Sequence, residues 1–183
     1  MKPIVGFALA FLAGCGGASA DLRSAEPYER YLGVRELSHG RDAAAMAEVV
    51  AALDDPHPLV VVGALEVLAE IGRKEFLQHV APRTEHASPM VRRTAVESLA
   101  AIRNEEGLPY AVRAVKDADP LVRRGAVKAL AAFGARPEVL RALLQAFEAN
   151  DAGLALVAHE TLQALTGRRD VPRSREAWAK VVS

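Results

Sequence analysis

Two pairs of adjacent arginines have the side-chain type and the spacing that could do chemistry. Arg92-Arg93 and Arg123-Arg124 lie 31 residues apart, and each pair follows a proline by three residues. A guanidinium group is a planar fork of donors that fits a carboxylate or a phosphate. Two roles are open for these residues: a structural ladder between repeats, or a groove for an acidic partner. Arg93 and Arg124 are the better candidates for the groove.

A second candidate is the pair His159-Glu160, because adjacent His and Glu side chains occur in metal sites. No other histidine of the chain is followed by a glutamate. One His and one Glu cannot complete the coordination shell of a metal ion. We therefore expect no metal, and we expect His159 to replace an aliphatic residue in the last, irregular repeat.

Other signatures of catalysis are missing from the sequence. It contains no glycine-rich phosphate loop, no Cys/His cluster for zinc and no G-x-S-x-G sequence. Only 5% of the residues are aromatic, which leaves few platforms for stacking nucleic acid bases. We predict no catalytic residue, no cofactor, no small-molecule substrate and no nucleic acid partner.

The third candidate is Cys15, the only cysteine in the chain. It ends the sequence L-A-G-C after an apolar run, residues 3–13, that is too short to span a bilayer but has the length of an export signal. These residues resemble the lipobox of bacterial lipoproteins. The resemblance implies cleavage between Gly14 and Cys15 and lipids on Cys15. In lipoproteins of the enterobacterial type, an aspartate at the position of Gly16 retains the protein at the inner membrane, so by that rule Gly16 implies an outer-membrane protein facing the periplasm.

A competing signal overlaps the first. Ala18-Ser19-Ala20 fits an ordinary signal peptidase site, which would release a soluble periplasmic or secreted protein that begins at Asp21. Residues 15–25 are mostly small and polar, which is typical of a flexible tether.

The strongest signal of architecture is a repeat of 31 residues. Prolines stand at positions 27, 58, 89 and 120, and two of them begin P-M-V-R-R-T-A and P-L-V-R-R-G-A. Self-similarity at a period of this size is typical of a solenoid. Because proline fits the first position of a helix, each copy predicts a helix that begins there. Ser88 and Asp119 are good N-caps for two of these helices, whereas Glu26 and His57 are poor ones.

Each predicted helix has one apolar face. In the copy that begins at Pro120, the residues six, seven and ten positions later are Ala126, Val127 and Leu130. The other copies carry similar residues at these positions. Partner helices with their own apolar period are predicted at 42–53, 74–80, 105–115 and 137–147. A fifth copy of the proline helix, without its proline, is predicted at 154–165. Pro82 should end the helix before it. The predicted stops of the proline helices are Gly40, Gly72, Asn104 and Gly134.

Charge is balanced over the chain but not along it. The formal net charge is zero. Residues 1–79 hold 7 basic and 11 acidic side chains, and residues 80–183 hold 16 basic and 12 acidic ones. In a linear array of repeats this predicts an acidic end and a basic end.

The repeat resembles the short HEAT-like repeats, a type also found in phycobilisome lyases. The matching residues in the last full copy are Asp117, Pro120, Val122, Arg123, Ala126, Leu130 and Gly134. The resemblance implies an all-α, right-handed α-solenoid of about four to five helical hairpins. It also implies that Arg123 pairs with Asp117, although His86 stands at the acidic position of the preceding copy.

These observations predict four segments. They are a signal peptide at 1–14, a tether at 15–25, the HEAT-like repeats at 26–167 and a capping segment at 168–183, in which Trp178 covers the last repeat. The outward row of the solenoid is expected to carry Val62, Arg93 and Arg124, with Glu66, Glu97, Lys128 and Glu160 one turn further on. Of these, Arg93, Arg124, Lys128 and Glu97 are the candidate partner-binding residues.

The function that we predict is a non-enzymatic scaffold for another protein of the bacterial envelope, anchored in the membrane through Cys15. Three alternatives stay open. One is a subunit of a HEAT-like enzyme of the bilin lyase or metal-dependent hydroxylase type. Another is a soluble secreted binding protein cleaved after Ala20. The third is a purely structural spacer at the membrane.

Overall fold

The computed structural model describes residues 22–40 and 42–182, and in these ranges the regular structure is helical throughout. Gly14, Cys15 and Ala20, which carry the two expected cleavage sites, lie outside the described residues. None of the helices within the described ranges combines the length and the apolar character that a bilayer crossing needs.

Five helices form the first of two layers. Four of them begin at the prolines of the 31-residue repeat, as predicted, and the fifth begins after Asp151, whose side chain accepts from the backbone N–H of Leu154. These helices, called the long row below, are α1 (Pro27–Glu36), α3 (Pro58–Ile71), α5 (Pro89–Ile102), α7 (Pro120–Ala129) and α9 (Ala152–Thr166).

The helices between them form the second layer, called the short row. They are α2 (Ala43–Ala51), α4 (Leu77–Val80), α6 (Leu108–Ala114), α8 (Pro137–Gln145) and α10 (Arg175–Val182). Short 3-10 turns extend or join the helices at Leu37–His39, Ala52–Asp54, Lys74–Phe76, Ala81–Glu85, Glu105–Gly107 and Leu130–Phe133. Helix α4 ends at Val80, two residues before Pro82, as the proline predicts.

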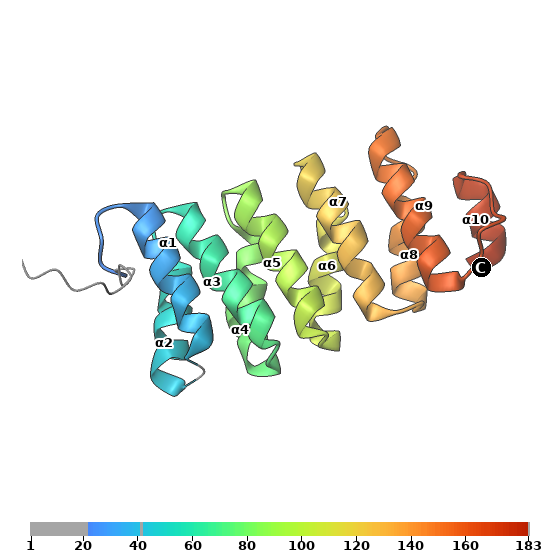
Figure 1. The fold of residues 1–183 in the computed structure, drawn as a ribbon. Coiled ribbons are helices and arrows are strands. Elements are labelled where there is room, and N and C mark those ends of the chain that lie inside the picture. Colours follow the sequence, from blue (N-terminus) through green and yellow to red (C-terminus); the bar gives the residue numbers. More distant parts are fainter. Residues whose placement is uncertain (1–21, 41, 183) are drawn as a thin grey trace, which may run out of the picture.

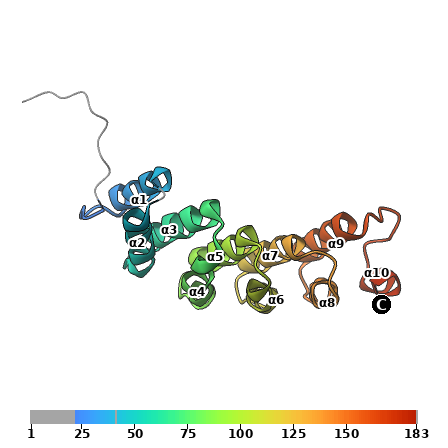
Figure 2. The same ribbon diagram turned by 90° about the horizontal axis from the view of Figure 1, so that it is seen from below.

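The two rows stack side by side into an α-solenoid. In Figure 1 the helices of the long row cross the molecule in chain order, each against the next, from α1 at one end to α9 at the other. Figure 2 shows the short row beneath it and the long row on the inner side of a shallow arc. The predicted all-α solenoid is confirmed.

The core follows the periodic positions of the sequence. Ala64, Ala95 and Ala126 have no exposed surface, and neither do the leucines four residues after each of them, which are Leu68, Leu99 and Leu130. A small residue at a helix crossing lets two backbones approach closely, which explains why the first position never carries a large side chain. The buried residues form two clusters that adjoin at α5, so each repeat is packed against its neighbours.

Two predictions about helix ends are wrong. Arg103, not Asn104, takes the left-handed conformation that ends α5, with φ of 53°. Asn104 instead accepts from the backbone N–H of Glu106 and begins the next turn. At the N-termini, Ser88 makes no side-chain cap, whereas Nδ1 of His57 accepts from the backbone N–H of Leu59 at 3.3 Å.

The C-terminal segment covers the open end of the array. Trp178 of α10 is completely buried and belongs to the same apolar cluster as Val139 and Leu143 of α8. Its indole Nε1 donates to Nδ1 of His159 at 2.9 Å, and the two rings meet edge to face. The capping role predicted for Trp178 is confirmed. His159, which was predicted to replace an aliphatic residue of the last repeat, is the polar partner of this cap.

Loss of the Trp178 ring should destabilise the whole C-terminal end. We expect Trp178→Ala to reduce the free energy of unfolding by about 3–5 kcal/mol, because it empties a fully buried site. Trp178→Phe should cost less, since it keeps one aromatic ring in the site, although it loses the bond to His159 and the volume of the second ring. Urea unfolding followed by circular dichroism measures both, with Lys180→Ala on the exposed side of α10 as the control. Equal small losses in Trp178→Ala and Lys180→Ala would contradict a capping role.

Candidate functional site

The inner arginine of each pair ties the bend before its own helix to the bend of the next repeat. In Arg92, Nη1 donates to the carbonyl oxygens of His86 and Ala87, both at 3.0 Å. Nε and Nη2 donate to the two carboxylate oxygens of Asp117, both at 2.8 Å. Asp117 in turn accepts from the backbone N–H of Asp119. We call this unit, an arginine, two carbonyls and the next carboxylate, a rung.

Arg30 forms the same rung at the N-terminal end. Its Nη1 donates to the carbonyl oxygens of Ser24 and Ala25, and its Nε and Nη2 donate to Asp55 at 2.7 and 2.9 Å. Leu22 packs against the adjoining apolar cluster. The described end of the segment predicted as a tether is thus held against the body of the protein.

The pairing implied for Arg123 needs a correction. Its Nη1 donates to the backbone carbonyls of Asp117 and Ala118, and its Nη2 to the carboxylate of Asp151 at 3.2 Å. The carboxylate of Asp117 is already bound by Arg92. The arginine therefore takes backbone groups from its own repeat and a carboxylate from the following one.

One rung is absent, and both of its partners are replaced together. At the arginine position of α3 stands Val61, which is fully buried, and at the matching acidic position stands His86. Nδ1 of His86 still accepts from the backbone N–H of Ser88, as Asp117 does from Asp119. A carboxylate left here without its arginine would be an uncompensated charge in a poorly solvated place.

The rungs hold their carboxylates in the charged form. The hydrogen bonds from Arg30 and Arg92 are the largest cause of the lowered pKa values of Asp55 and Asp117. The backbone N–H of Leu154, with Arg124 and Arg123, lowers the pKa of Asp151 to about 2. The aspartates are thus ionised at neutral pH and serve the scaffold.

The outer arginines lie across the neighbouring helix of the long row, and glycines make room for them. A Cβ added to Gly125 would meet Cγ of Arg93 at 2.8 Å, and one added to Gly153 would meet Nη2 of Arg124 at 2.6 Å. Tyr31 lies over Gly63 in the same way. Each large side chain therefore lies flat on the next helix, and its tip reaches the face of the long row.

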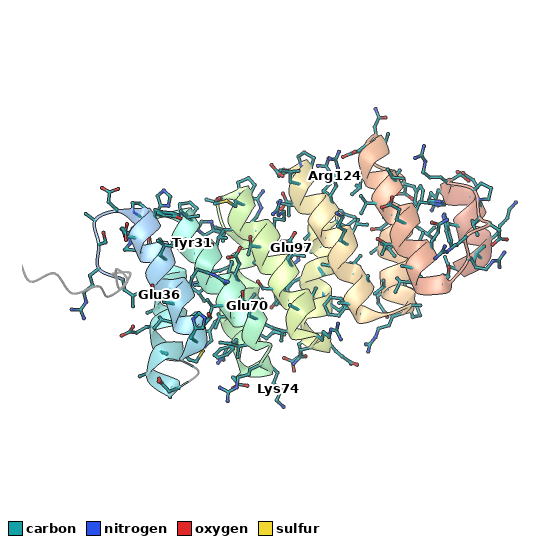
Figure 3. The ribbon with its side chains drawn as sticks, viewed as in Figure 1. Tyr31, Glu36, Glu70, Lys74, Glu97 and Arg124 are labelled. Carbon is teal, nitrogen blue, oxygen red and sulfur yellow. The ribbon has the colours of Figure 1, made fainter. Side chains whose placement is uncertain are left out.

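The outer arginines keep most of their donors free. Arg93 makes no hydrogen bond to a described residue; its one close charge is Glu97, 3.3 Å away on the same helix. Arg124 donates once, to Asp151 at 3.2 Å. Their side chains are 43% and 42% exposed. Figure 3 shows Arg124 near the start of α7 and Glu97 further along α5, on the same face as Tyr31 and Glu70.

The structure places the other predicted surface residues less evenly. Lys128 is exposed one turn after Arg124, and Glu97 one turn after Arg93, so the four candidate residues share the face of α5 and α7. Val62 is only 7% exposed, and its place in the outward row was wrong. A valine side chain at this position is too short to extend past the neighbouring helix, whereas an arginine is long enough.

Exposed apolar side chains mark the same face, and our reading of the sequence missed them. The described residues include four exposed large hydrophobic side chains, and all four belong to the long row: Tyr28, Met90, Leu121 and Leu156. The first three follow the repeat prolines directly, and Leu59, which is partly exposed, holds the same position in α3. The sequence does contain a signal for them: an apolar residue directly follows each repeat proline, at a position that does not belong to the buried face of the helix.

Two hollows open on this face. The smaller, of about 290 Å³, lies between α5 and α7 and is lined by Pro89, Met90, Arg93, Asp119 and Leu121. The larger, of about 600 Å³, lies over α1, α3 and α5, and half of its lining residues are charged, among them Arg35, Glu66 and Glu97. A further hollow of about 570 Å³ lies on the short row around Tyr110 and Arg113.

No group of three His, Cys, Asp or Glu side chains within residues 22–40 and 42–182 is placed to hold a metal ion. His159, the one histidine with a following glutamate, is engaged by Trp178.

Residues 77–166 match the family model of HEAT repeats. This segment runs from α4 to the end of α9 and contains both arginine pairs, so the predicted HEAT-like repeats are confirmed there. No curated protein matches the sequence significantly.

Solved structures share the architecture at low sequence identity. A designed armadillo repeat protein in complex with peptide (KR)4 is 18% identical, with a TM-score of 0.56 over 88% of this chain and 96% of that one. An engineered protein has 18% identity and a TM-score of 0.55 over 88% and 82%. The complex of CpcE and CpcF of phycocyanin lyase from Nostoc has 18% identity and a TM-score of 0.49 over 90% and 82%. The first two establish the repeat fold.

Removal of both partners of a rung should cost less than the sum of the two single removals. Arg92→Val and Asp117→His together copy the natural pair Val61 and His86. We expect each single change to lose about 1–2 kcal/mol of unfolding free energy, as charge-assisted hydrogen bonds at partly solvated sites do. The double variant should lose less than the sum, because no charge is left unpaired. Urea unfolding of all four proteins at pH 7 gives the coupling, and strict additivity of the two losses would contradict the rung.

Proposed function

We propose that this protein is a non-enzymatic scaffold that binds another envelope protein on the face of its long row and is anchored to a bacterial membrane through Cys15. The observation that carries the proposal is the face itself. Every exposed large hydrophobic side chain of the described residues lies on α1, α5, α7 or α9. A contiguous exposed apolar patch among polar residues marks an interaction site. Met90 and Leu121 form such a patch, because they line the same hollow.

The charged groups support binding more than catalysis. The inner arginines and their aspartates are spent on the rungs between repeats. The outer arginines lie along a surface and are not gathered in a deep cavity with a base or nucleophile. A solenoid offers this kind of extended surface to a partner. A designed armadillo repeat protein of similar fold is in complex with a peptide. This supports the proposal that the helices of the present protein also offer a surface to a polypeptide.

The proposed anchor rests on the lipobox-like residues 12–15. Six residues, 16–21, separate Cys15 from Leu22, which packs against the first repeats. Even a fully extended chain of this length reaches only about 25 Å. The lipid would therefore keep the α1 end of the solenoid close to the membrane and leave the rest of the long row open to the periplasm.

The anchor is tested by fractionation of the wild type and Cys15→Ala, with the intact mass of each mature form. We expect the wild type in the membrane fraction with an acylated N-terminal Cys15, and loss of both in the variant. A mature protein that begins at Asp21 would instead be soluble and periplasmic or secreted. An unprocessed chain in the cytoplasm would contradict the anchor and the envelope location together.

The scaffold role is tested by site-specific photo-cross-linking in cells. A photoreactive residue at Lys128, on the long row, should give a discrete cross-linked partner. The same residue at Arg141, exposed on α8 of the short row, should not. Equal or absent cross-linking at both positions would contradict binding on the long row.

A further inference from the structure

We infer that the face of α5 and α7 binds an extended segment that carries aliphatic and acidic side chains, with an aliphatic side chain in the hollow between Met90 and Leu121 and carboxylates at Arg93 and Arg124. This inference deepens the proposed scaffold function and rests on it. Three features of the face indicate the chemistry of the partner. They are the size of the hollow, the arginine N–H groups that have no hydrogen-bond acceptor, and the spacing of the helices.

The hollow suits a side chain better than a separate small molecule. Its volume is about 290 Å³, at the lower limit of ordinary ligand pockets. Met90 and Leu121 stand on its two sides and are 45% and 55% exposed. A methionine side chain is flexible and adapts its shape to what it contacts. An inserted leucine or valine would remove these two apolar side chains from water together.

The adjacent charge favours acidic groups. Arg93 lines the hollow and donates no hydrogen bond to a described residue, while Nε of both Arg93 and Arg124 is buried without a partner. Lys128 adds a further exposed cation on α7. Two aspartates near the hollow are already engaged: Asp119 accepts from the backbone N–H groups of Leu121 and Val122, and Asp151 is bound by two arginines.

The acidic neighbour Glu97 does not remove this preference. Its side chain is 47% exposed and lies 3.3 Å from Nε of Arg93, without hydrogen-bond geometry. An exposed i,i+4 pair of this kind is weak, so a partner carboxylate can compete for the outward-facing Nη groups. A guanidinium fork binds a carboxylate through two donors, and this is the contact that the partner would supply.

The spacing of the helices favours an extended partner. Packed helices lie about 8–10 Å apart, so the equivalent positions of neighbouring repeats recur at about this distance. An extended polyproline II segment rises about 3.1 Å per residue and presents every third residue to successive helices. A helical partner rises about 1.5 Å per residue, so six residues would span one repeat, which is not a whole number of turns.

A synthetic peptide of this pattern tests the inference directly. The probe is fluorescein-labelled (Leu-Glu-Pro)5, whose prolines favour the extended form. The matched peptides (Leu-Lys-Pro)5 and (Ser-Glu-Pro)5 remove the acidic and the aliphatic side chains in turn. Fluorescence anisotropy with the full lipidated chain in detergent should show saturable binding of the first peptide. Both others should bind at least about tenfold more weakly, and binding of the first should weaken at high salt.

Variants place the site on the protein. Arg93→Glu should weaken the probe about tenfold, and Leu121→Ser should weaken it as well. The matched control is Arg141→Glu on α8, which changes an equally exposed arginine with a loose partner on its own helix, Glu138 at 3.7 Å. Each substitution places a second acid one turn from a glutamate, Glu97 or Glu138, and Arg93→Glu also loses the contact with Gly125. Thermal unfolding should show that both variants remain folded at the temperature of the binding assay.

Several results would overturn the inference. They are no saturable binding of (Leu-Glu-Pro)5, equal binding of the lysine peptide, or equal losses in Arg93→Glu and Arg141→Glu. Sedimentation velocity gives another: a dimer of the full chain that Leu121→Ser dissociates would assign the face to a second copy. The photo-cross-linking test is independent of these results. A discrete partner cross-linked at Lys128 would support the scaffold function even if the partner does not have the aliphatic and acidic pattern inferred here.

Discussion

The arginine–aspartate rung ties the bends of neighbouring repeats together in this solenoid, at every step except the one where Val61 and His86 replace it. Each repeat contacts only its neighbours, so the bends between short and long helices need ties of their own. Arg92 supplies them by binding two carbonyls of the bend before α5 and the carboxylate of the bend before α7. One side chain thereby satisfies backbone groups and sets the distance between two repeats.

The inner arginines, Arg92 and Arg123, are occupied by the bonds between repeats, and the outer arginines have a different role. Arg93 and Arg124 follow them directly in sequence but lie flat on Gly125 and Gly153 of the next helix. Glycine at these positions costs helix propensity, about 1 kcal/mol relative to alanine. The gain is a row of guanidinium tips on the face of the long row, beside apolar side chains that the core does not need. Scaffold and surface are thus built by neighbouring residues of one helix turn.

The two ends of the array solve the problem of an uncovered repeat differently. At the C-terminal end α10 packs Trp178 into the apolar cluster of α8 and α9, and the indole N–H donates a hydrogen bond to His159. At the N-terminal end Arg30 holds residues 24 and 25 against α1 and binds Asp55 of the second repeat. At both ends a polar contact orients a segment, and the apolar side chains of that segment pack on the terminal repeat beside it. The His159–Trp178 bond shows why a polar residue replaces an aliphatic one there.

The sequence by itself determined the repeat, the first residue of four helices, the buried faces and the covering role of Trp178. All of these follow from the local helix period and from proline, whose effects reach only a few residues along the chain. Tertiary structure decided which charges meet. Arg123 binds the carboxylate of Asp151 and not that of Asp117, and Val61 and His86 replace one rung together, because the bends of neighbouring repeats approach each other only after the helices stack. Stacking also buried Val62 and left Arg93 exposed at equivalent positions, since the length of the side chain decides whether it reaches past the next helix.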